Sequence, residues 1–332
     1  MTDSPAIALL GDVMLGRKVA ERLGREAAAT VWSSELADLV GSCDAVVCNL
    51  ECCVSGRGTR TRRIRRKPFF FRAPPAATEA LAAAGVTAVS LANNHALDYE
   101  EEALADTLEH LAAASIACAG AGLDVERARL GAVVPAGGLR LGVLAATDHP
   151  GEFGAGNDCP GVAFADLPAG LPDWIPAELS RLREEADIVV AFPHWGPNMT
   201  SEPAPWQRTR ASELIAAGAD LVAGHSAHVF HGIEWLGERP VLYDLGGALD
   251  DYAVDSRLRN DLGILALWHP RSQPEVELVG LELLFCETRL ARGGAADWIA
   301  ARLESACAAF GTRLERVGEE RFAVLPEPSA AT

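Results

Sequence analysis

Short apolar runs that each end in polar or ionisable residues recur along this chain, and they restrict its fold more than any other feature. Continuous apolar runs of about four to eight residues, bounded by turn-forming residues, are typical of strands buried on both faces. Stretches of helical length, rich in alanine, leucine and glutamate, lie between several of them. This alternation predicts an α/β fold with much parallel sheet. The predicted strands cover residues 6–10, 45–48, 86–92, 141–147, 188–193, 221–224 and 241–245, and the clearest helices cover 75–84, 100–114 and 205–217.

The last part of the chain has a different pattern. Residues 262–268 and 275–283 are predicted to form consecutive antiparallel strands, and 295–310 form an amphipathic helix that ends at Gly311. The residues after Arg321 have the composition of a loose tail. Because no linker or internal repeat interrupts the pattern, we expect one domain over residues 1–321 and a flexible tail over 322–332.

The charge balance and the apolar segments exclude several classes of protein. The chain has 29 Lys and Arg against 46 Asp and Glu, a net charge of −17, which argues against a nucleic-acid partner. The start of the chain has no signal-peptide pattern, and no apolar segment approaches the ~18 residues of a membrane span. We therefore expect a soluble, cytoplasmic protein without a membrane anchor.

The eight cysteines have no spacing typical of a secreted disulfide framework. Four of them, Cys43, Cys48, Cys52 and Cys53, are close together in the sequence, which raises the alternative of a zinc or iron–sulfur site. Two are adjacent and the first lies at the start of a predicted strand, so convergence on one ion is awkward. Burial as small apolar side chains is the preferred interpretation.

The ends of the predicted strands carry the residues that suggest chemistry. In open parallel sheets, ligands bind beyond the carboxyl ends of the strands. Each such residue alone is more often a turn residue, a helix cap or a structural histidine. Their recurrence at six strand ends favours a site for one or two divalent ions, Mn²⁺, Fe²⁺ or Zn²⁺, which accept carboxylate, amide and imidazole ligands. The candidates are Asp12, Asn49, Glu51, Asn94, His95, His194, His225 and His228.

The triplet Asn93-Asn94-His95 is the most informative of these. An amide can bind a metal, while an adjacent histidine remains free to donate a proton to a leaving group. Asp98 either orients the His95 imidazole, as carboxylates near metal sites do, or caps the helix that begins near Glu100.

Several separated motifs occur together in one order along the chain. They are Gly11-Asp12-Val-Met-Leu-Gly-Arg17, Asn49-Leu-Glu51, Leu91-Ala-Asn-Asn-His-Ala-Leu-Asp98, His194-Trp-Gly196, Gly218-Ala-Asp220 and Gly224-His-Ser-Ala-His-Val229. Over residues 6–255 the chain resembles the bacterial CapA/PgsA capsule-synthesis proteins, the poly-γ-glutamate group related to calcineurin-like metallophosphoesterases. The resemblance implies a four-layer α/β/β/α sandwich of the metallophosphoesterase type. It also implies that His95 is the proton donor and that the metal ligands are Asp12, Glu51, Asn94, His194, His225 and His228.

Two positions depart from the broader phosphoesterase pattern. Met14 stands where the first motif has a histidine, and Asn49-Leu50-Glu51 stands where the second has Gly-Asp. Whether one ion or two are bound therefore stays open.

Residues 57–67 contain six arginines and one lysine, within an otherwise acidic chain. The segment is either a solvated loop or a mobile basic lid that recruits an anionic substrate. Other residues expected to bind substrate are Arg17, Asn49, Asn93, Arg63 and Trp195.

These features together predict a metal-dependent hydrolase that acts on a phosphoester or amide bond of an anionic small molecule or polymer. One alternative is an enzyme of the same fold that uses the same acid and base groups for dehydration or cyclisation. Another is a non-catalytic accessory protein that binds an acidic polymer through the basic segment.

Overall fold

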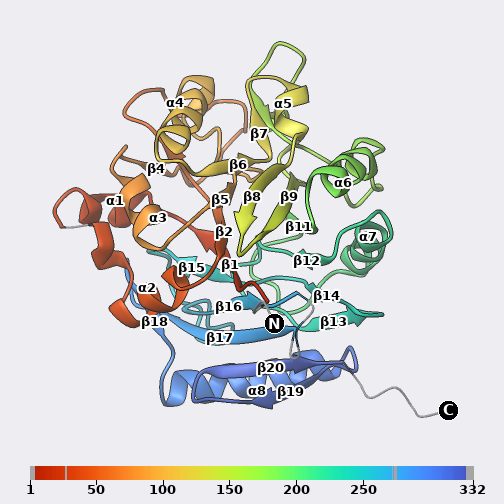
Figure 1. The fold of residues 1–332 in the computed structure, drawn as a ribbon. Coiled ribbons are helices and arrows are strands. Elements are labelled where there is room, and N and C mark those ends of the chain that lie inside the picture. Colours follow the sequence, from red (N-terminus) through yellow and green to blue (C-terminus); the bar gives the residue numbers. More distant parts are fainter. Residues whose placement is uncertain (1–3, 27, 271, 273–274, 327–332) are drawn as a thin grey trace.

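Two large β-sheets packed face to face form the centre of the protein (Figure 1). The computed structural model describes residues 4–26, 28–270, 272 and 275–326. Helices cover the outer faces of both sheets, and this confirms the predicted four-layer α/β/β/α sandwich. Within the described residues, the first sheet contains, in pairing order, β19 (Arg313–Arg316), β20 (Arg321–Leu325), β17 (Val276–Leu283), β16 (Leu262–Trp268), β1 (Ile7–Val13), β2 (Ala45–Leu50), β5 (Ala88–Ser90) and β6 (Ala117–Ala119), with β15 (Gly247–Leu249) beside β1 and β18 (Thr288–Leu290) beside β17.

The second sheet is smaller and is mostly parallel. Its strands pair in the order β13 (Ile233–Leu236), β14 (Arg239–Leu242), β12 (Leu221–Ala223), β11 (Ile188–His194), β9 (Leu139–Thr147) and β8 (Ala132–Ala136). Two short sheets lie outside these layers, formed by β3 (Cys53–Val54) with β4 (Arg72–Ala73) and by β7 (Ala121–Gly122) with β10 (Gly161–Val162).

The apolar runs correspond to strands that are buried on both faces. In β1, Ile7 and Leu9 face the core between the two sheets, whereas Ala8 and Leu10 face the helices on the other side. Neither face of such a strand meets water, so its sequence shows no polar alternation. Every run predicted to be a strand overlaps one in the structure, although the bounds differ: the strands are β1, β2, β5, β9, β11, β12 and β14.

Amphipathic helices supply the outer layers. The first sheet is covered by α1 (Arg17–Leu23), α2 (Ser34–Gly41), α3 (Ala77–Ala83) and α4 (Glu100–Ala113), and the second by α6 (Trp174–Glu185) and α7 (Pro205–Ala216). The short helix α5 (Val125–Arg129) packs on β7 and β10, and two short 3-10 helices cover Ala28–Val31 and Gly151–Phe153.

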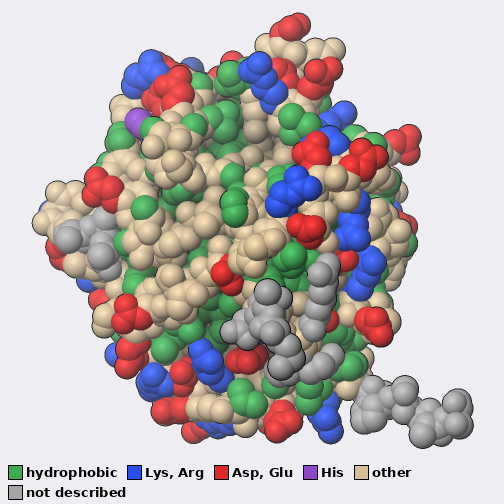
Figure 2. Space-filling view, in the orientation of Figure 1, with side chains coloured by type: hydrophobic (Ala, Val, Ile, Leu, Met, Phe, Trp, Pro, Cys, Tyr) green, Lys and Arg blue, Asp and Glu red, His purple; other side chains and the backbone are tan. Residues whose placement is uncertain are grey.

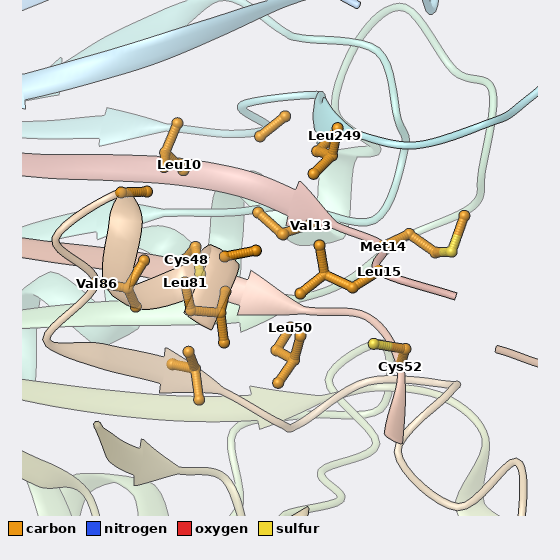
Figure 3. Close-up of a cluster of buried hydrophobic side chains, with 14 of the residues drawn as sticks. Leu10, Val13, Met14, Leu15, Cys48, Leu50, Cys52, Leu81, Val86 and Leu249 are labelled. Carbon is orange, nitrogen blue, oxygen red and sulfur yellow. The ribbon is translucent and has the colours of Figure 1, made fainter. Parts of the chain in front are cut away.

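Figure 3 shows part of the core under the first helical layer, which includes Leu10, Leu50 and Leu81 and two of the clustered cysteines. Cys48 and Cys52 are fully buried there, and burial raises the pKa of each thiol to about 12. Within the described residues, no group that could hold a metal includes a cysteine. The interpretation as buried small apolar side chains is confirmed for Cys48, Cys52 and Cys53, whereas Cys43 is only partly buried.

The C-terminal part extends the first sheet. The predicted antiparallel pair is β16 and β17, and the predicted helix is α8 (Gly294–Ala308), which packs against β16, β17 and β19. The expectation of a loose tail from residue 322 is wrong for the residues that form β20. Phe322 and Val324 are buried there, so this strand contributes to the core. Residues 327–332 of the expected tail lie outside the described residues.

An irregularity near the end of β1 positions the first candidate ligand. The pairing of β1 with β2 shifts register between Leu10 and Asp12, and β15 joins β1 at this point. A side chain at Gly11 would lie 1.9 Å from the Gly246 carbonyl oxygen, so the two backbones approach too closely for any other residue. Asp12 is thereby placed at the carboxyl end of the sheet.

No helix within the described residues is long and apolar enough to cross a membrane. Acidic and basic side chains are interspersed on the face of the protein shown in Figure 2.

Candidate metal centre

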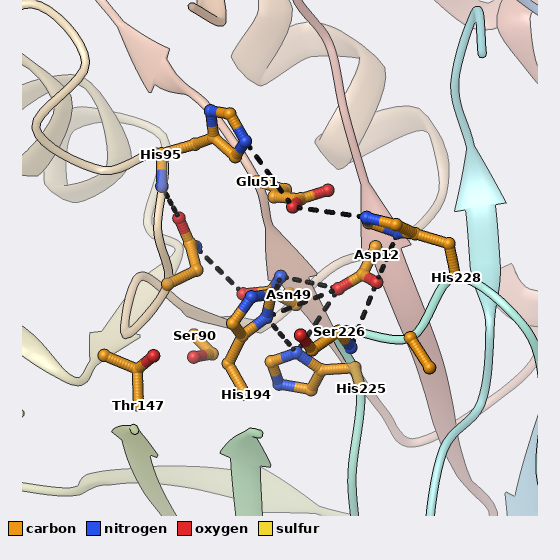
Figure 4. Close-up of polar contacts among 12 residues, drawn as sticks. Asp12, Asn49, Glu51, Ser90, His95, Thr147, His194, His225, Ser226 and His228 are labelled. Carbon is orange, nitrogen blue, oxygen red and sulfur yellow. Dashed lines mark hydrogen bonds and ion pairs between the residues drawn. The ribbon is translucent and has the colours of Figure 1, made fainter. Parts of the chain in front are cut away.

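The carboxyl ends of strands from both sheets meet at one buried polar cluster (Figure 4). The first sheet contributes the end of β1, the end of β2 and the loop between β5 and α4. The second sheet contributes the end of β11 and the loop after β12. The predicted residues that meet there are Asp12, Asn49, Glu51, Asn93, His95, Asp98, His194, His225 and His228.

Asp12 lies at the centre and accepts two hydrogen bonds. Asn49 Nδ2 donates to Asp12 Oδ1 at 2.8 Å, and the Ser226 backbone N–H donates to Oδ2 at 3.2 Å. Asn93 Nδ2 in turn donates to Asn49 Oδ1 at 3.0 Å and so fixes the orientation of that amide. These bonds hold the carboxylate in one position.

Three histidines face the Asp12 carboxylate. His194 Nδ1 and His225 Nδ1 lie 3.7 and 3.3 Å from Asp12 Oδ1, and only 2.9 Å from each other. His228 Nδ1 lies 3.0 Å from Asp12 Oδ2. Ring nitrogens that converge on one carboxylate from several sides are the arrangement expected of metal ligands.

Glu51 forms the other side of the cluster. Its Oε1 lies 3.8 Å from His228 Nε2 and 3.9 Å from His95 Nε2, and the Tyr252 hydroxyl donates to Oε2 at 3.1 Å. Glu51 therefore connects the histidines of the β12 loop with the loop that carries His95.

Two overlapping groups of donors could each hold a cation. Asp12, His194 and His225 form one, and Asp12, Glu51 and His228 form the other, with the donor atoms of each within 4.8 Å of one another. Asp12 belongs to both groups. Asp12 could therefore be a ligand in either group, or in both if two cations were bound.

Unsatisfied buried atoms indicate that these residues fit a metal. Buried atoms without a hydrogen-bond partner in the described chain include Glu51 Oε1, His194 Nε2 and His225 Nε2. A polar atom that is buried without a partner lowers the stability of the fold. Several such atoms close together therefore fit a site that binds a cation.

The electrostatics of the cluster favour a positive charge between Asp12 and Glu51. Burial alone would raise the pKa of Asp12, but hydrogen bonds and charges of His225 and His228 hold it well below its usual value. Burial raises the pKa of Glu51 to about 8, although the charge of His228 opposes the change. Burial alone would lower the pKa of His228, but Glu51 and Asp12 raise it to about 10. A divalent cation would supply the charge that both carboxylates require.

His95 lies beside the cluster and is held by Asp98. His95 Nδ1 is 2.5 Å from Asp98 Oδ2, and Lys67 Nζ is 3.1 Å from Asp98 Oδ1. The Phe71 ring stacks on the imidazole with 3.9 Å between centroids, and the Phe71 N–H also donates to Asp98. Burial lowers the pKa of His95 to about 4, despite the opposing charge of Asp98. Nδ1 is therefore fixed against Asp98, and Nε2 points toward Glu51.

A cavity of about 350 Å³ opens beside His95 and His228. Arg17 lines it, and its guanidinium lies 5.6 and 5.7 Å from the ring centroids of Phe71 and Tyr252. An ion pair of 3.0 Å with Asp251 holds this arginine in place. Arg17 therefore lines a cavity beside His95, and its contact with a substrate stays a prediction.

Other predicted residues lie elsewhere. Trp195 is fully buried among the side chains under α6 and α7, and its indole N–H donates to the Tyr243 carbonyl at 2.9 Å, so it belongs to the core. Arg63 pairs with Glu100 and Glu101 at the start of α4. Asn94 lies between Asn93 and His95, and its buried side-chain oxygen has no hydrogen-bond partner among the described residues, so its role as a metal ligand stays a prediction.

The basic segment is partly neutralised by α4. Arg57 pairs with Glu102 and Asp106, as Arg63 does with its two glutamates, whereas Arg62, Arg65 and Arg66 are exposed. Lys67 is the basic residue of this segment that contacts the candidate centre.

Several residues at the centre were not in the predicted set. Tyr252, Ser226 and Phe71 contact predicted residues. A tyrosine, serine or phenylalanine does not by itself indicate a place at a metal centre. His149 is the exception, because it follows Asp148 at the end of a predicted strand, as the other histidines do. Its Nδ1 pairs with Asp148, and its ring centroid is 5.2 Å from that of His194.

The family model described as bacterial capsule synthesis protein PGA_cap matches residues 6–252. The chain belongs to this family. A probable polyglutamine synthesis accessory protein of Mycobacterium tuberculosis is 32% identical over 98% of the chain and 97% of its own length. This PGA_cap protein is also 28% identical to the capsule biosynthesis protein CapA of Bacillus anthracis and 30% identical to the PGA biosynthesis protein CapA of Bacillus subtilis. Those matches cover 74% and 75% of the chain, and 59% and 64% of the two relatives.

Proposed function

We propose that this PGA_cap protein is a metal-dependent hydrolase that cleaves an amide or phosphoester bond of an anionic substrate. The observation that carries the proposal is the position of Asp12 in two donor groups at once. A structural cation site has one closed set of ligands, whereas two cations held side by side can stabilise both the attacking and the leaving oxygen of a hydrolysis.

Mn²⁺, Fe²⁺ or Zn²⁺ bound here would polarise the scissile group and lower the pKa of a water molecule. Asp12, His194 and His225 would hold a metal ion in one group. Asp12, Glu51 and His228 would hold a metal ion in the other. The buried amides of Asn49 and Asn93 keep the Asp12 carboxylate oriented for this role.

His95 is suited to proton transfer. Asp98 fixes its Nδ1, so Nε2 is the atom that exchanges a proton with the leaving group. Phe71 restricts the ring to one orientation by stacking on it. Arg17, on the wall of the adjoining cavity, is placed to attract an anionic group of the substrate.

The relatives are named for polyglutamine synthesis, capsule biosynthesis and PGA biosynthesis, and poly-γ-glutamate is therefore the first substrate that we propose to test. We would measure release of free amine from poly-γ-glutamate and of phosphate from p-nitrophenyl phosphate, each in ¹⁸O water with added Mn²⁺, Fe²⁺ or Zn²⁺. Hydrolysis incorporates ¹⁸O into the product, whereas dehydration or cyclisation by the same groups would not.

The ligand assignment is tested with Asp12→Asn. We expect this variant to lose bound metal in elemental analysis and to lose turnover, because the charge shared by both groups is removed. Asp173→Asn is the matched control, since Asp173 is exposed at the start of α6. Full metal content in Asp12→Asn would contradict the assignment.

A second candidate function is a non-catalytic accessory role, which the description of the mycobacterial relative as a probable polyglutamine synthesis accessory protein favours. Wild-type protein that binds poly-γ-glutamate in a salt-sensitive manner, contains no metal and releases no product would establish this role instead.

A further inference from the structure

A second cavity, of about 630 Å³, lies between α8 and the loop at residues 201–203. Trp298 and Phe310 contribute aromatic surface to it, and Ser305 contributes a hydroxyl group. None of the residues at the candidate metal centre lines it. Its size is within the range of about 300–1,000 Å³ that is typical of pockets for small molecules.

Arg302 is the cation of this cavity, and within the described chain no carboxylate pairs with it. Its guanidinium carbon lies 5.1 Å from the Phe230 ring centroid and 5.4 Å from that of Trp298. Nη2 donates to the Phe230 carbonyl at 3.3 Å, and Nε is buried without a hydrogen-bond partner among the described residues. Burial lowers the pKa of this guanidinium.

This arrangement is favourable for binding a carboxylate. The two rings and the carbonyl hold the planar guanidinium in place, so little side-chain entropy would be lost when an anion binds. A half-buried arginine without a counter-ion also gains more from an anion than a solvated one would, because the local dielectric constant is low.

Glu202 adds the opposite charge to the same cavity. Glu202 is exposed and lines the cavity, and within the described residues it forms no ion pair with Arg302. A ligand with one carboxylate and one ammonium group would meet both charges. A dianionic phosphate would be repelled by Glu202 and is disfavoured for that reason.

We propose that this cavity binds an α-amino acid with an apolar side chain. The carboxylate lies against Arg302, the ammonium group faces Glu202, and the side chain packs against Trp298 and Phe310. The site goes beyond the proposed function, because it uses none of the residues of the metal centre.

Calorimetric titration with three probes tests the proposal on the intact protein. L-Phenylalanine carries both charges, 3-phenylpropanoate lacks the ammonium group, and phenethylamine lacks the carboxylate. We expect saturable binding of L-phenylalanine, at least about tenfold tighter than either analogue, because each analogue leaves one charge of the cavity unpaired. No saturable binding of L-phenylalanine, or equal binding of the analogues, would overturn the proposal.

Substitutions of residues that line the cavity test where L-phenylalanine binds. Arg302→Gln and Glu202→Gln should each weaken L-phenylalanine binding at least about tenfold. Their controls are Arg313→Gln on β19 and Glu304→Gln on α8, two exposed residues outside the cavity. Ala301→Trp, at an exposed cavity position, should block binding with an unchanged circular dichroism spectrum. Undiminished binding in Arg302→Gln or in Ala301→Trp would show that the ligand does not bind here.

Discussion

Single side chains at the metal centre are held by more than one constraint. The Asp98 carboxylate binds the imidazole of His95, the ammonium group of Lys67 and the backbone of Phe71 at the same time. Because several partners hold Asp98, substitution of one of them would leave the other contacts to orient His95. This makes His95 a better target for mutation than the residues that position it.

We expect His95→Gln to lower kcat by about 10²–10⁴-fold, the usual contribution of a general acid or base. Bound metal should be unchanged in elemental analysis, because His95 belongs to neither donor group within the described residues. His110→Gln, a half-buried histidine on α4, is the control for both measurements. A loss of metal in His95→Gln would show that His95 is a ligand and not a proton-transfer group.

The sequence predicted the residues of this centre unevenly. Asp12, His194 and His225 follow directly from polar residues at strand ends, because the carboxyl ends of parallel strands share one edge. Tyr252 could not be found in this way, since it comes from a loop after β15, a strand too short to show a pattern. Trp195 was misplaced because its neighbour His194 faces the centre while Trp195 itself turns into the core.

At the scale of elements, the β12 strand and its loop depend on one small residue. Gly224 joins β12 to the loop that carries His225 and His228. A side chain at Gly224 would lie 2.2 Å from the Tyr243 carbonyl oxygen and 2.3 Å from Trp195 Nε1. Both neighbours are buried and cannot move aside without repacking.

Gly224→Ala should therefore lower the free energy of unfolding by about 1–3 kcal/mol, the usual cost of overpacking, and reduce bound metal by displacing His225. Chemical denaturation and elemental analysis measure the two effects. At Gly41 an added side chain meets nothing within 4 Å, so Gly41→Ala on α2 is the matched control. Equal stability of the two variants would contradict this account of the loop.

The elements themselves differed in how far the sequence revealed them. Strands buried on both faces, such as β1 and β11, were predicted because their apolar runs are continuous. The strand β20 was missed because its segment is short and lies at the end of the chain, where charged residues precede it. It is held by pairing with β17, a contact that no local pattern reports.

At the scale of the whole molecule, the metal centre joins the two sheets. Asp12 lies on β1 and Glu51 directly follows β2 of the first sheet, and His194, His225 and His228 belong to the second sheet or its loops. A cation bound between them would stabilise the sandwich as well as provide chemistry, because it binds the folded protein and not the unfolded chain.

Metal added to protein stripped with a chelator should therefore raise the melting temperature. At a metal concentration of 100 times Kd, the gain in free energy of unfolding is about 2.7 kcal/mol, or about 4 °C in a chain of this length. Scanning calorimetry of wild type and Asp12→Asn measures it, and the variant should show no increase. An equal increase in both proteins would place the binding at another site.

The charge distribution of the whole molecule leads to the last prediction. The net charge of −17 repels an anionic polymer, whereas the exposed Arg65 and Arg66 attract it locally. They precede Phe69, which lines the cavity beside His95.

If the basic segment recruits substrate, Arg65→Gln/Arg66→Gln should raise KM for poly-γ-glutamate several-fold at low salt and leave kcat unchanged, because steering acts before the chemical step. The difference should vanish near 1 M salt, where the screening length is about 3 Å. The double variant Arg25→Gln/Arg313→Gln removes the same charge from exposed positions outside this segment and should keep the wild-type KM. A KM that rises equally in both double variants would show that net charge, and not the basic segment, governs recruitment.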